Sequence, residues 1–149
     1  MNLFHSMKIS ASGMSAERLR MDVIASNIAN ADTTRTPEGG AYRRHVSLMQ
    51  AQPAVNSFQF LLRRSKAAIF EPYLNGVRVG AIVEDPSPMK MVYDPTHPDA
   101  QEDGYVEYPN VDIMKEMVEL ITASRGYESN VTAFNSVKNM ALKALEIGR

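Results

Sequence analysis

Apolar side chains recur every three or four residues at both ends of the chain, and neither end contains a proline. All eight prolines lie between Pro37 and Pro109. Because proline in the interior of a helix costs about 3 kcal/mol, this distribution predicts two long terminal helices that flank a turn-rich insert. An amphipathic helix must cover its apolar stripe, so we expect the two ends of the chain to pack together and against neighbouring molecules.

The first helix is predicted over residues 3–31, with a heptad seam whose positions alternate at spacings of four and three. The seam positions are mostly apolar: Leu3, Met7, Ser10, Met14, Glu17, Met21, Ile24, Ile28 and Ala31. The helix is expected to stop around Asp32, Thr33 and Thr34, because their side chains compete for backbone hydrogen bonds.

The last segment repeats this arrangement, and either Asn110 or Asp112 is expected to cap the start of its helix. Gly148 lies where a C-terminal capping glycine belongs. The seam positions are Ile113, Met117, Leu120, Ser124, Tyr127, Val131, Phe134, Lys138, Ala141 and Leu145. A second apolar stripe consists of Met114, Val118 and Ile121. A helix with two apolar stripes has more than one packing partner, so one stripe is predicted to meet the first helix and the other a neighbouring molecule.

A register for the two helices follows from their polar interruptions. If the helices are antiparallel and paired position numbers sum to about 155, Glu17 faces Lys138 across the seam. The same register pairs Met14 with Ala141, Met21 with Phe134, Ile24 with Val131 and Ile28 with Tyr127. A single pair of opposite charges can fix the register of a coiled coil, although a slip of one heptad would preserve most of the apolar matches.

Between the helices the period of the apolar residues changes to two, which is typical of strands. Strands are predicted over residues 42–49, 77–84, 89–93 and 105–108, the second opened by Asn75 and Gly76. Loops are expected over residues 32–41 and 94–104. The segment 50–66 has no clear periodicity.

The predicted fold class is therefore α+β, with long N- and C-terminal helices in an antiparallel coiled coil flanking a small β-rich insert. We expect residues 1–34 and 110–149 to form a helical inner domain. Residues 35–109 are expected to form the insert and its loops. An insert of this size is small for an independent core, so it is expected to lean on the helices or on other subunits.

Composition gives little support to an enzyme or a nucleic-acid-binding protein. The net charge is −1 and no segment is strongly basic, so no nucleic-acid partner is expected. The short cluster Arg63, Arg64 and Lys66 lacks interleaved aromatic residues. The absence of cysteine excludes disulfides and thiol catalysis. The chain has no phosphate loop, nucleophile elbow or zinc-binding motif, so neither a cofactor nor a small-molecule substrate is expected.

The best candidate for catalysis or metal binding is the loop of residues 94–104, which contains Asp94, His97, Asp99 and Asp103. Carboxylates and a histidine could hold a hard cation, which would make the chain a metal-dependent enzyme. The spacing is not that of a calcium loop, however, and aspartate beside proline is ordinary in turns. We therefore predict a solvated turn and no enzyme activity.

The chain has no feature of a membrane-spanning segment or of a secretion leader. It contains no stretch of 18 apolar residues, so no direct membrane span is expected. Its first residues include no apolar run of signal-peptide length and no basic leader, so any export is expected to occur without a cleaved signal peptide.

The end of the first predicted helix carries a recognisable motif. Residues 26–35 resemble the S-N-x-A-N-x-x-T-T-R signature of bacterial flagellar axial proteins. The matching residues are Ser26, Asn27, Ala29, Asn30, Thr33, Thr34 and Arg35. The resemblance continues through residues 93–100, 104–106, 108–112, 116–118, 124–131 and 143–148, which include Asn110, Asp112, Arg125, Tyr127 and Asn130. The D-P-T-H-P-D-A and P-N-V-D blocks make the chain similar to the proximal-rod subunits of the flagellar basal body.

This resemblance implies a structural subunit of the basal-body rod, the drive shaft that crosses the periplasm. It implies that the terminal helices form an inner layer of antiparallel coiled coil around an export channel, with the insert outside. It also implies export through the type III apparatus of the flagellum. The expected partners are copies of the same chain and other rod subunits, assembled into a hollow shaft that transmits torque.

The side chains expected at subunit interfaces belong to the seams of both helices: Met7, Met14, Met21, Ile24, Ile28, Met117, Leu120, Tyr127, Val131, Phe134 and Leu145. Flexible methionine suits interfaces with non-identical neighbours, although the same residues could simply fill a core. A free-standing helical hairpin that acts as an adaptor for a soluble partner stays open as an alternative. It predicts well-ordered helix ends in the isolated chain, whereas a rod subunit predicts mobile ends that order on assembly.

Overall fold

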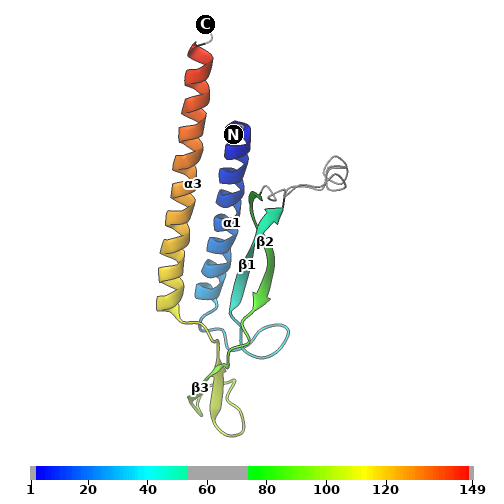
Figure 1. Cartoon of the computed structure of the whole chain (residues 1–149). Helices are drawn as coiled ribbons and strands as arrows, with labels where there is room; N and C mark the ends of the chain where they lie inside the picture. Colours follow the sequence, from blue (N-terminus) through cyan, green and yellow to red (C-terminus); the bar gives the residue numbers. More distant parts are fainter. Residues whose placement is uncertain (1–2, 54–73, 148–149) are drawn as a thin grey trace, which may run out of the picture.

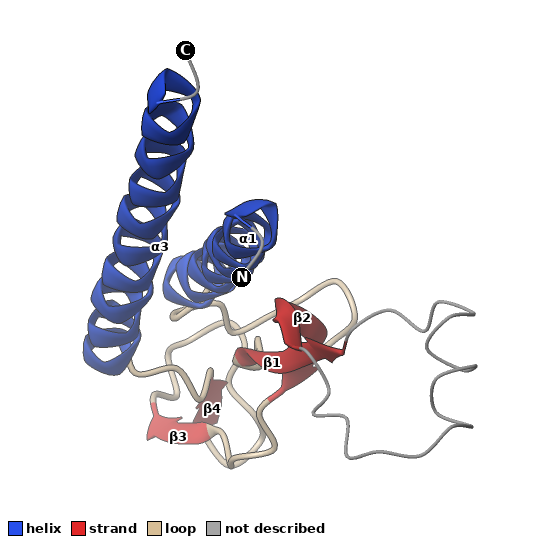
Figure 2. Ribbon diagram, turned by 45° about the horizontal axis from the view of Figure 1, so that its top comes forward, coloured by secondary structure: helices blue, strands red, loops and turns tan. Residues whose placement is uncertain are grey.

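The computed structural model describes residues 3–53 and 74–147 and has an α+β architecture (Figure 1). Two long helices lie side by side, and two small antiparallel β ribbons occupy the segment between them in the chain (Figure 2). The elements in chain order are α1 (Leu3–Ala29), β1 (His45–Pro53), β2 (Leu74–Glu84), β3 (Lys90–Tyr93), β4 (Tyr105–Tyr108) and α3 (Ile113–Ile147). The predicted cap Gly148, the basic cluster 63–66 and most of the segment 50–66 lie outside the described residues.

Both helices begin and end close to the predicted positions. α1 stops at Ala29, just before the residues expected to end it. α3 begins at Ile113, and of the two candidate caps Asp112 is the one in place. Its Oδ1 accepts a hydrogen bond from Met114 N at 3.1 Å, which satisfies a free donor of the first turn and puts a carboxylate at the positive end of the helix dipole.

The four predicted strands are present, although β1 begins at His45 and not at Tyr42, and they pair into two separate antiparallel ribbons. β1 pairs with β2 from His45 opposite Glu84 onwards, and β3 pairs with β4. Near the start of β2, Gly76 has a positive φ of 111°, and a Cβ here would lie 2.0 Å from Ser12 Oγ of α1. Only glycine fits this close approach. Ser12 Oγ also accepts a hydrogen bond from Val77 N at 3.1 Å, so the ribbon is fixed on α1.

α1 lies between α3 and the β1–β2 ribbon, and it contacts both (Figure 1). The buried apolar side chains are few and mostly small: Ala16, Val23, Ile24, Ala31, Val106, Val111 and Ala123. This core covers one face of α3 and leaves many of its apolar side chains exposed. Neither α1 nor α3 combines the length and the hydropathy that a membrane span requires.

The two helices are antiparallel, but their register differs from the predicted one. A Cβ at Gly13 would lie 2.7 Å from Asn130 Oδ1, and a Cβ at Gly126 would lie 3.2 Å from Glu17 Oε1. Paired position numbers therefore sum to 143. The predicted contact between Glu17 and Lys138 is wrong, because Lys138 lies about 18 Å further along α3 than Gly126 at 1.5 Å per residue. The apolar pairs predicted with it are displaced by the same amount.

This register leaves the end of α3 without a partner helix in the described part of the chain. Leu3, the first residue of α1, lies opposite residue 140, so residues 141–147 project beyond α1 (Figure 1). We call residues 141–147 the projecting end. Its two leucines, Leu142 and Leu145, are both exposed.

Gly13→Ala is expected to destabilise the helix pair, although alanine favours a helix by about 1 kcal/mol over glycine. The new methyl group would meet Asn130 Oδ1, and a hydrogen bond from Asn130 Nδ2 to Gly126 O at 2.8 Å holds this amide in place. In urea unfolding we expect a loss of about 1–2 kcal/mol, and a neutral or stabilising effect in an Asn130→Ala background. An equal loss in both backgrounds would contradict the observed register.

Candidate functional site

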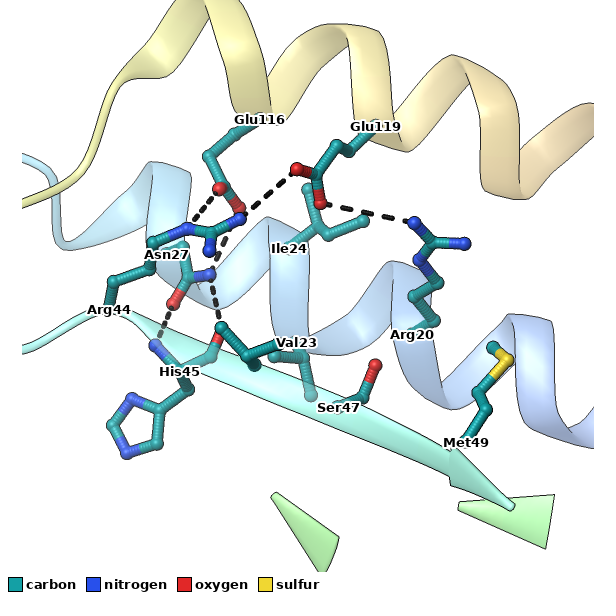
Figure 3. A pocket seen from close by; sticks show the side chains of 11 residues that line it. Arg20, Val23, Ile24, Asn27, Arg44, His45, Ser47, Met49, Glu116 and Glu119 are labelled. Atoms are coloured by element: carbon teal, nitrogen blue, oxygen red, sulfur yellow. Dashed lines mark hydrogen bonds and ion pairs between the residues drawn. The ribbon is translucent and has the colours of Figure 1, made fainter. Parts of the chain in front are cut away.

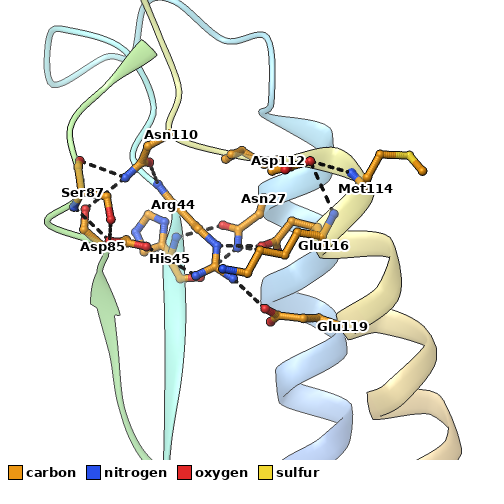
Figure 4. Close-up of polar contacts among 12 residues, drawn as sticks. Asn27, Arg44, His45, Asp85, Ser87, Asn110, Asp112, Met114, Glu116 and Glu119 are labelled. Atoms are coloured by element: carbon orange, nitrogen blue, oxygen red, sulfur yellow. Dashed lines mark hydrogen bonds and ion pairs between the residues drawn. The ribbon is translucent and has the colours of Figure 1, made fainter.

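Five polar side chains meet where α1, α3 and the start of β1 converge (Figure 4). We call this cluster the polar junction, and it consists of Asn27, Arg44, Asp85, Glu116 and Glu119. Asn27 lies in the last turn of α1, and the two glutamates lie in the first turns of α3. Arg44 precedes β1 and Asp85 follows β2. The polar junction therefore joins both helices to the first β ribbon.

Glu116 lies at the centre of the polar junction, and its side chain is 0% exposed. Its Oε1 accepts a hydrogen bond from Arg44 Nε at 2.7 Å, and its Oε2 accepts one from Asn27 Nδ2 at 3.0 Å. A buried carboxylate costs several kcal/mol unless it is paired and hydrogen-bonded. Since both oxygens have a donor here, the contact holds α3 at one position relative to α1 and β1.

The guanidinium of Arg44 reaches two further carboxylates. Its Nη2 lies 3.3 Å from Glu119 Oε1, and its Nη1 lies 3.5 Å from Asp85 Oδ2. Burial disfavours the charged form of Arg44, but the hydrogen bond and the charge of Glu116, with Glu119 and Asp85, outweigh this effect and raise its pKa. Hydrogen bonds from Ser87 and then from Arg44 lower the pKa of Asp85. Arg44 therefore stays charged in this position at neutral pH.

Asn27 fastens β1 to α1 through a side chain that is almost completely buried. Its Oδ1 accepts a hydrogen bond from His45 N at 2.9 Å, and its Nδ2 donates to His45 O at 2.8 Å (Figure 3). The same Oδ1 accepts a hydrogen bond from the Tyr42 hydroxyl at 3.0 Å. One amide thus binds both backbone groups of His45, as a neighbouring strand would. With the contact to Glu116, it uses both donors and both acceptor positions of the asparagine side chain.

The other polar residues of the motif at the end of α1 organise the turn that follows. Asn30 Nδ2 donates to a backbone carbonyl one turn earlier at 2.9 Å, and Thr33 Oγ1 donates to Asn30 Oδ1 at 3.2 Å. Thr34 Oγ1 donates to Asp99 Oδ2 at 2.9 Å, and Arg35 Nη1 lies 3.6 Å from Asp99 Oδ1. This turn is therefore tied to the loop between β3 and β4.

Of the remaining motif residues, Asn110 and Asp112 lie just before α3, three lie along α3, and Ser26 and Ala29 lie on α1. Asn110 Oδ1 accepts a hydrogen bond from Arg44 N at 2.9 Å, and its Nδ2 donates to Asp85 O at 3.2 Å. Asn110 therefore connects the segment before α3 to the polar junction, while Asp112 caps the helix. Of the others, Tyr127 and Asn130 are partly buried, and Ser26, Ala29 and Arg125 are exposed.

The residues predicted for the helix seams differ in burial. Ile24 is buried, whereas Met117 and Leu145 are exposed. The others are partly buried: Met7, Met14, Met21, Ile28, Leu120, Tyr127, Val131 and Phe134. The role of these residues at subunit interfaces stays a prediction.

The first turns of α3 expose a continuous apolar surface. Met114, Met117, Val118 and Ile121 are 74%, 49%, 63% and 54% exposed. Their spacing of three and four residues places them on one face of the helix, and three of them form the second stripe that the sequence predicts. We call these four residues the exposed stripe. Contiguous exposed apolar side chains of this kind mark interaction surfaces.

An open groove of 260 Å³ lies beside the polar junction, between α1, β1 and α3 (Figure 3). Val23 and Met49 contribute apolar lining. The charged residues of the groove pair with one another, as Arg20 does with Glu119 at 4.0 Å. The chemistry of the groove therefore suits packing rather than catalysis.

The loop between β3 and β4 is a hydrogen-bonded turn. Asp94 Oδ1 accepts hydrogen bonds from Thr96 Oγ1 at 2.7 Å and from Thr96 N at 3.0 Å, and these bonds lower the pKa of Asp94. His97 Nδ1 accepts one from Asp99 N at 3.1 Å. Within the part of the chain that the structure describes, no three histidine or acidic residues are grouped to hold a metal ion.

Sequence reasoning missed the charged members of the polar junction. Arg44 occupies one polar position in an alternating segment, and Glu116 lies in the first turn of an amphipathic helix, where acidic residues are common. The sequence nevertheless contains an indication that Glu116 faces α1. A heptad frame that starts at Glu116 runs through Leu120, Ala123 and Tyr127, which are all partly or fully buried, and this frame would have placed Glu116 on the side of α3 that faces α1.

Asn27→Ala is expected to destabilise the chain much more than Asn30→Ala. The first change leaves Glu116 Oε2 and His45 N buried without their partners, and each such loss costs about 1–3 kcal/mol. The second change removes hydrogen bonds at a partly exposed turn. In urea unfolding we expect losses of about 3 kcal/mol and about 1 kcal/mol respectively. Similar losses for the two variants would show that the buried amide has no special role.

Two protein-family models match the chain. The model described as "Flagella basal body rod protein" matches residues 7–35, which contain most of α1 and the motif that follows it. The model described as "Flagellar basal body rod FlgEFG protein C-terminal" matches residues 102–147, which contain β4 and α3. The two matches include most of α1, all of α3 and the glutamates of the polar junction.

Relatives from several bacteria match the chain along its whole length. The flagellar basal-body rod protein FlgC of Bacillus subtilis (strain 168) is 47% identical, over 100% of both chains. The FlgC protein of Borreliella burgdorferi is 46% identical, over 99% of this chain and 98% of the relative. The FlgC protein of Salmonella typhimurium (strain LT2) is 36% identical, over 100% of both chains. With its two long helices, its polar junction and this similarity from end to end, the chain belongs to the FlgC family of flagellar basal-body rod proteins.

Proposed function

We propose that the chain is a structural subunit of the proximal rod of the flagellar basal body. In this role it assembles with copies of itself and with other rod subunits into a hollow drive shaft that transmits torque and surrounds the export channel. The observation that carries the proposal is the similarity to FlgC proteins over the full chain, at 36–47% identity. Members of this family are structural proteins and not enzymes.

The exposed stripe on α3 supports an assembly role. A soluble monomer rarely leaves several large apolar side chains exposed on one helix face. Here Val118 and Ile121 lie on the same face, one turn apart, and both are more than half exposed. A helix from a neighbouring subunit would remove this surface from water and gain about 25 cal/mol per Å² of apolar area.

The projecting end supports contacts with more than one neighbour. It carries Leu142 and Leu145 at one end of α3, whereas the exposed stripe lies near the other end. Two different apolar surfaces on one subunit form heterologous contacts, and such contacts build open helical assemblies or rings. We infer that α1 and α3 continue as an antiparallel coiled coil in which neighbouring subunits cover the seam residues that remain exposed, Met117 and Leu145 among them.

The polar junction suits a shaft under load. It ties α1, α3 and the first β ribbon together through buried, charge-assisted hydrogen bonds, which are shorter and stronger than neutral ones. Torque applied to the outside of the shaft would then reach the helices through Arg44 and Asn27. We propose that residues 1–34 and 110–149 form the inner layer of the rod, and that residues 35–109 lie outside it.

The export route and the location belong to the same proposal. The family resemblance supports passage through the type III apparatus of the flagellum and a final position in the part of the rod that crosses the periplasm. Within this proposal the export apparatus is a transient partner and the other rod subunits are permanent partners.

Hydrogen exchange distinguishes a rod subunit from a free-standing helical adaptor. In the isolated chain we expect rapid exchange in residues 141–147, since the described structure gives them no partner helix, and slow exchange in residues 116–134. In isolated basal bodies the projecting end should become protected. Slow exchange of the projecting end in the isolated chain would favour the adaptor.

Charged substitutions in the exposed stripe are expected to block assembly without unfolding the chain. Because both side chains are exposed, Val118→Glu with Ile121→Glu should change the free energy of unfolding by only about 0.5 kcal/mol. In cells that carry this variant as their sole copy, we expect loss of swimming in soft agar and loss of the variant from isolated rods. Arg78→Glu, at an exposed position of β2, serves as the control and should swim normally. Normal swimming of the double variant would refute the assembly role of the stripe.

A further inference from the structure

The apolar side chains of the two helices do not by themselves specify how α1 and α3 are aligned. Leu120 and Tyr127 are partly buried one heptad apart on α3, so a slip of seven residues replaces the first with the second. If α3 moved by one heptad toward the C-terminal end of α1, Ala133 would face Glu17 in place of Gly126. A Cβ at position 126 would lie 3.2 Å from Glu17 Oε1, so a small shift of this flexible side chain would admit the alanine. The heptad pattern alone therefore leaves a second register available.

The hydrogen bonds of the polar junction can form in only one of these registers. A slip of seven residues displaces α3 by about 10.5 Å, which moves Glu116 out of reach of both Arg44 and Asn27. Ala123, one heptad after Glu116, would take its place and offers no acceptor to either donor. A buried charge left without its partner is strongly destabilising, more so than the difference between two similar apolar contacts.

We propose that Arg44, acting through Glu116 and Asn27, selects the register of the two helices and thereby decides which parts of α3 remain uncovered. A single buried polar group can fix the register of a coiled coil. Here the selecting group comes from the β insert and not from either helix. Arg44 is thus a positioning residue for the surfaces of α3, although it lies on neither of them.

The register sets both candidate assembly surfaces at once. In the observed register residues 141–147 project beyond α1, and the exposed stripe lies beside the end of α1. After a slip of one heptad Leu3 would face Ile147, so the projecting end would be covered and the first turns of α3 would extend past α1. The importance of this change for rod assembly rests on the proposed function, but the register itself can be measured in the isolated chain.

Engineered cysteines report the register directly, because the chain has none of its own. The reporter is the full chain with Glu17→Cys, Gly126→Cys and Ala133→Cys. A Cβ at position 126 would lie 3.5 Å from Glu17 Cγ, which is compatible with a disulfide. After mild oxidation, peptide mass spectrometry gives the ratio of the 17–126 disulfide, from the observed register, to the 17–133 disulfide, from the slipped register.

The test compares this ratio with and without the charges of the polar junction. In the reporter chain the 17–126 disulfide should dominate. With Arg44→Met and Glu116→Leu, which replace the ion pair by apolar groups of similar size, the ratio should fall by at least tenfold. The control is Arg35→Met, which removes an exposed ion pair with Asp99 at 3.6 Å outside both helices and should leave the ratio unchanged. An unchanged ratio in the folded junction variant overturns the proposal.

A second variant tests the proposal if the variant with Arg44→Met and Glu116→Leu loses its helical circular dichroism. Glu116→Gln keeps the volume of the side chain but removes its charge, and it should lower the ratio by at least threefold. If the ratio is unchanged in this variant too, Arg44 does not select the register. Because the ratio is measured in the isolated chain, normal swimming of the stripe variant would refute the proposed function without affecting this result.

Discussion

The buried contact between Glu116 and Arg44 determines how the two helices and the first β ribbon are arranged. A carboxylate with no exposed surface is stable only where donors reach both of its oxygens. Arg44 and Asn27 meet this requirement from two different elements, so α1, α3 and β1 have one mutual arrangement. The small apolar core could not impose this arrangement alone, because it consists mostly of alanine and valine side chains.

Local features of the fold could be predicted from the sequence because each depends on neighbouring residues. The absence of proline marks the helices, and alternation marks the strands, so the bounds of α1, β2 and β4 agree closely with the predictions. The register of the helices could not be predicted in the same way. A heptad pattern is identical after a shift of seven residues, and the group that breaks this equivalence, Arg44, lies in the insert. A contact between Glu17 and Lys138 is compatible with the heptads, but both residues belong to the helices and neither reports on the insert.

The candidate site also combines features that the sequence predicts with contacts that it does not predict. Resemblance to flagellar axial proteins singled out Asn27, Asn110 and Asn130, and the structure gives each a physical role. Asn27 binds the backbone of β1, Asn110 binds the backbone of Arg44, and Asn130 packs against Gly13. The partners of the first two lie far away in the sequence, so spacing along one helix carried no information about them. The exposed stripe was predictable, since a second apolar face is visible in the heptads of α3.

The chain combines a buried, charged contact with large apolar side chains on its surface, and this combination is understandable for a subunit of a larger body. Glu116 is buried beside a small apolar core, while apolar side chains such as Met114 and Val118 remain exposed. Buried ion pairs add little net stability, because desolvation offsets most of their attraction, but they penalise every other arrangement. A subunit that gains its stability from neighbours needs this kind of specificity more than it needs a large core of its own. It must present the correct face before the neighbours arrive, and the apolar contacts of the assembly can then supply the free energy that the isolated chain lacks.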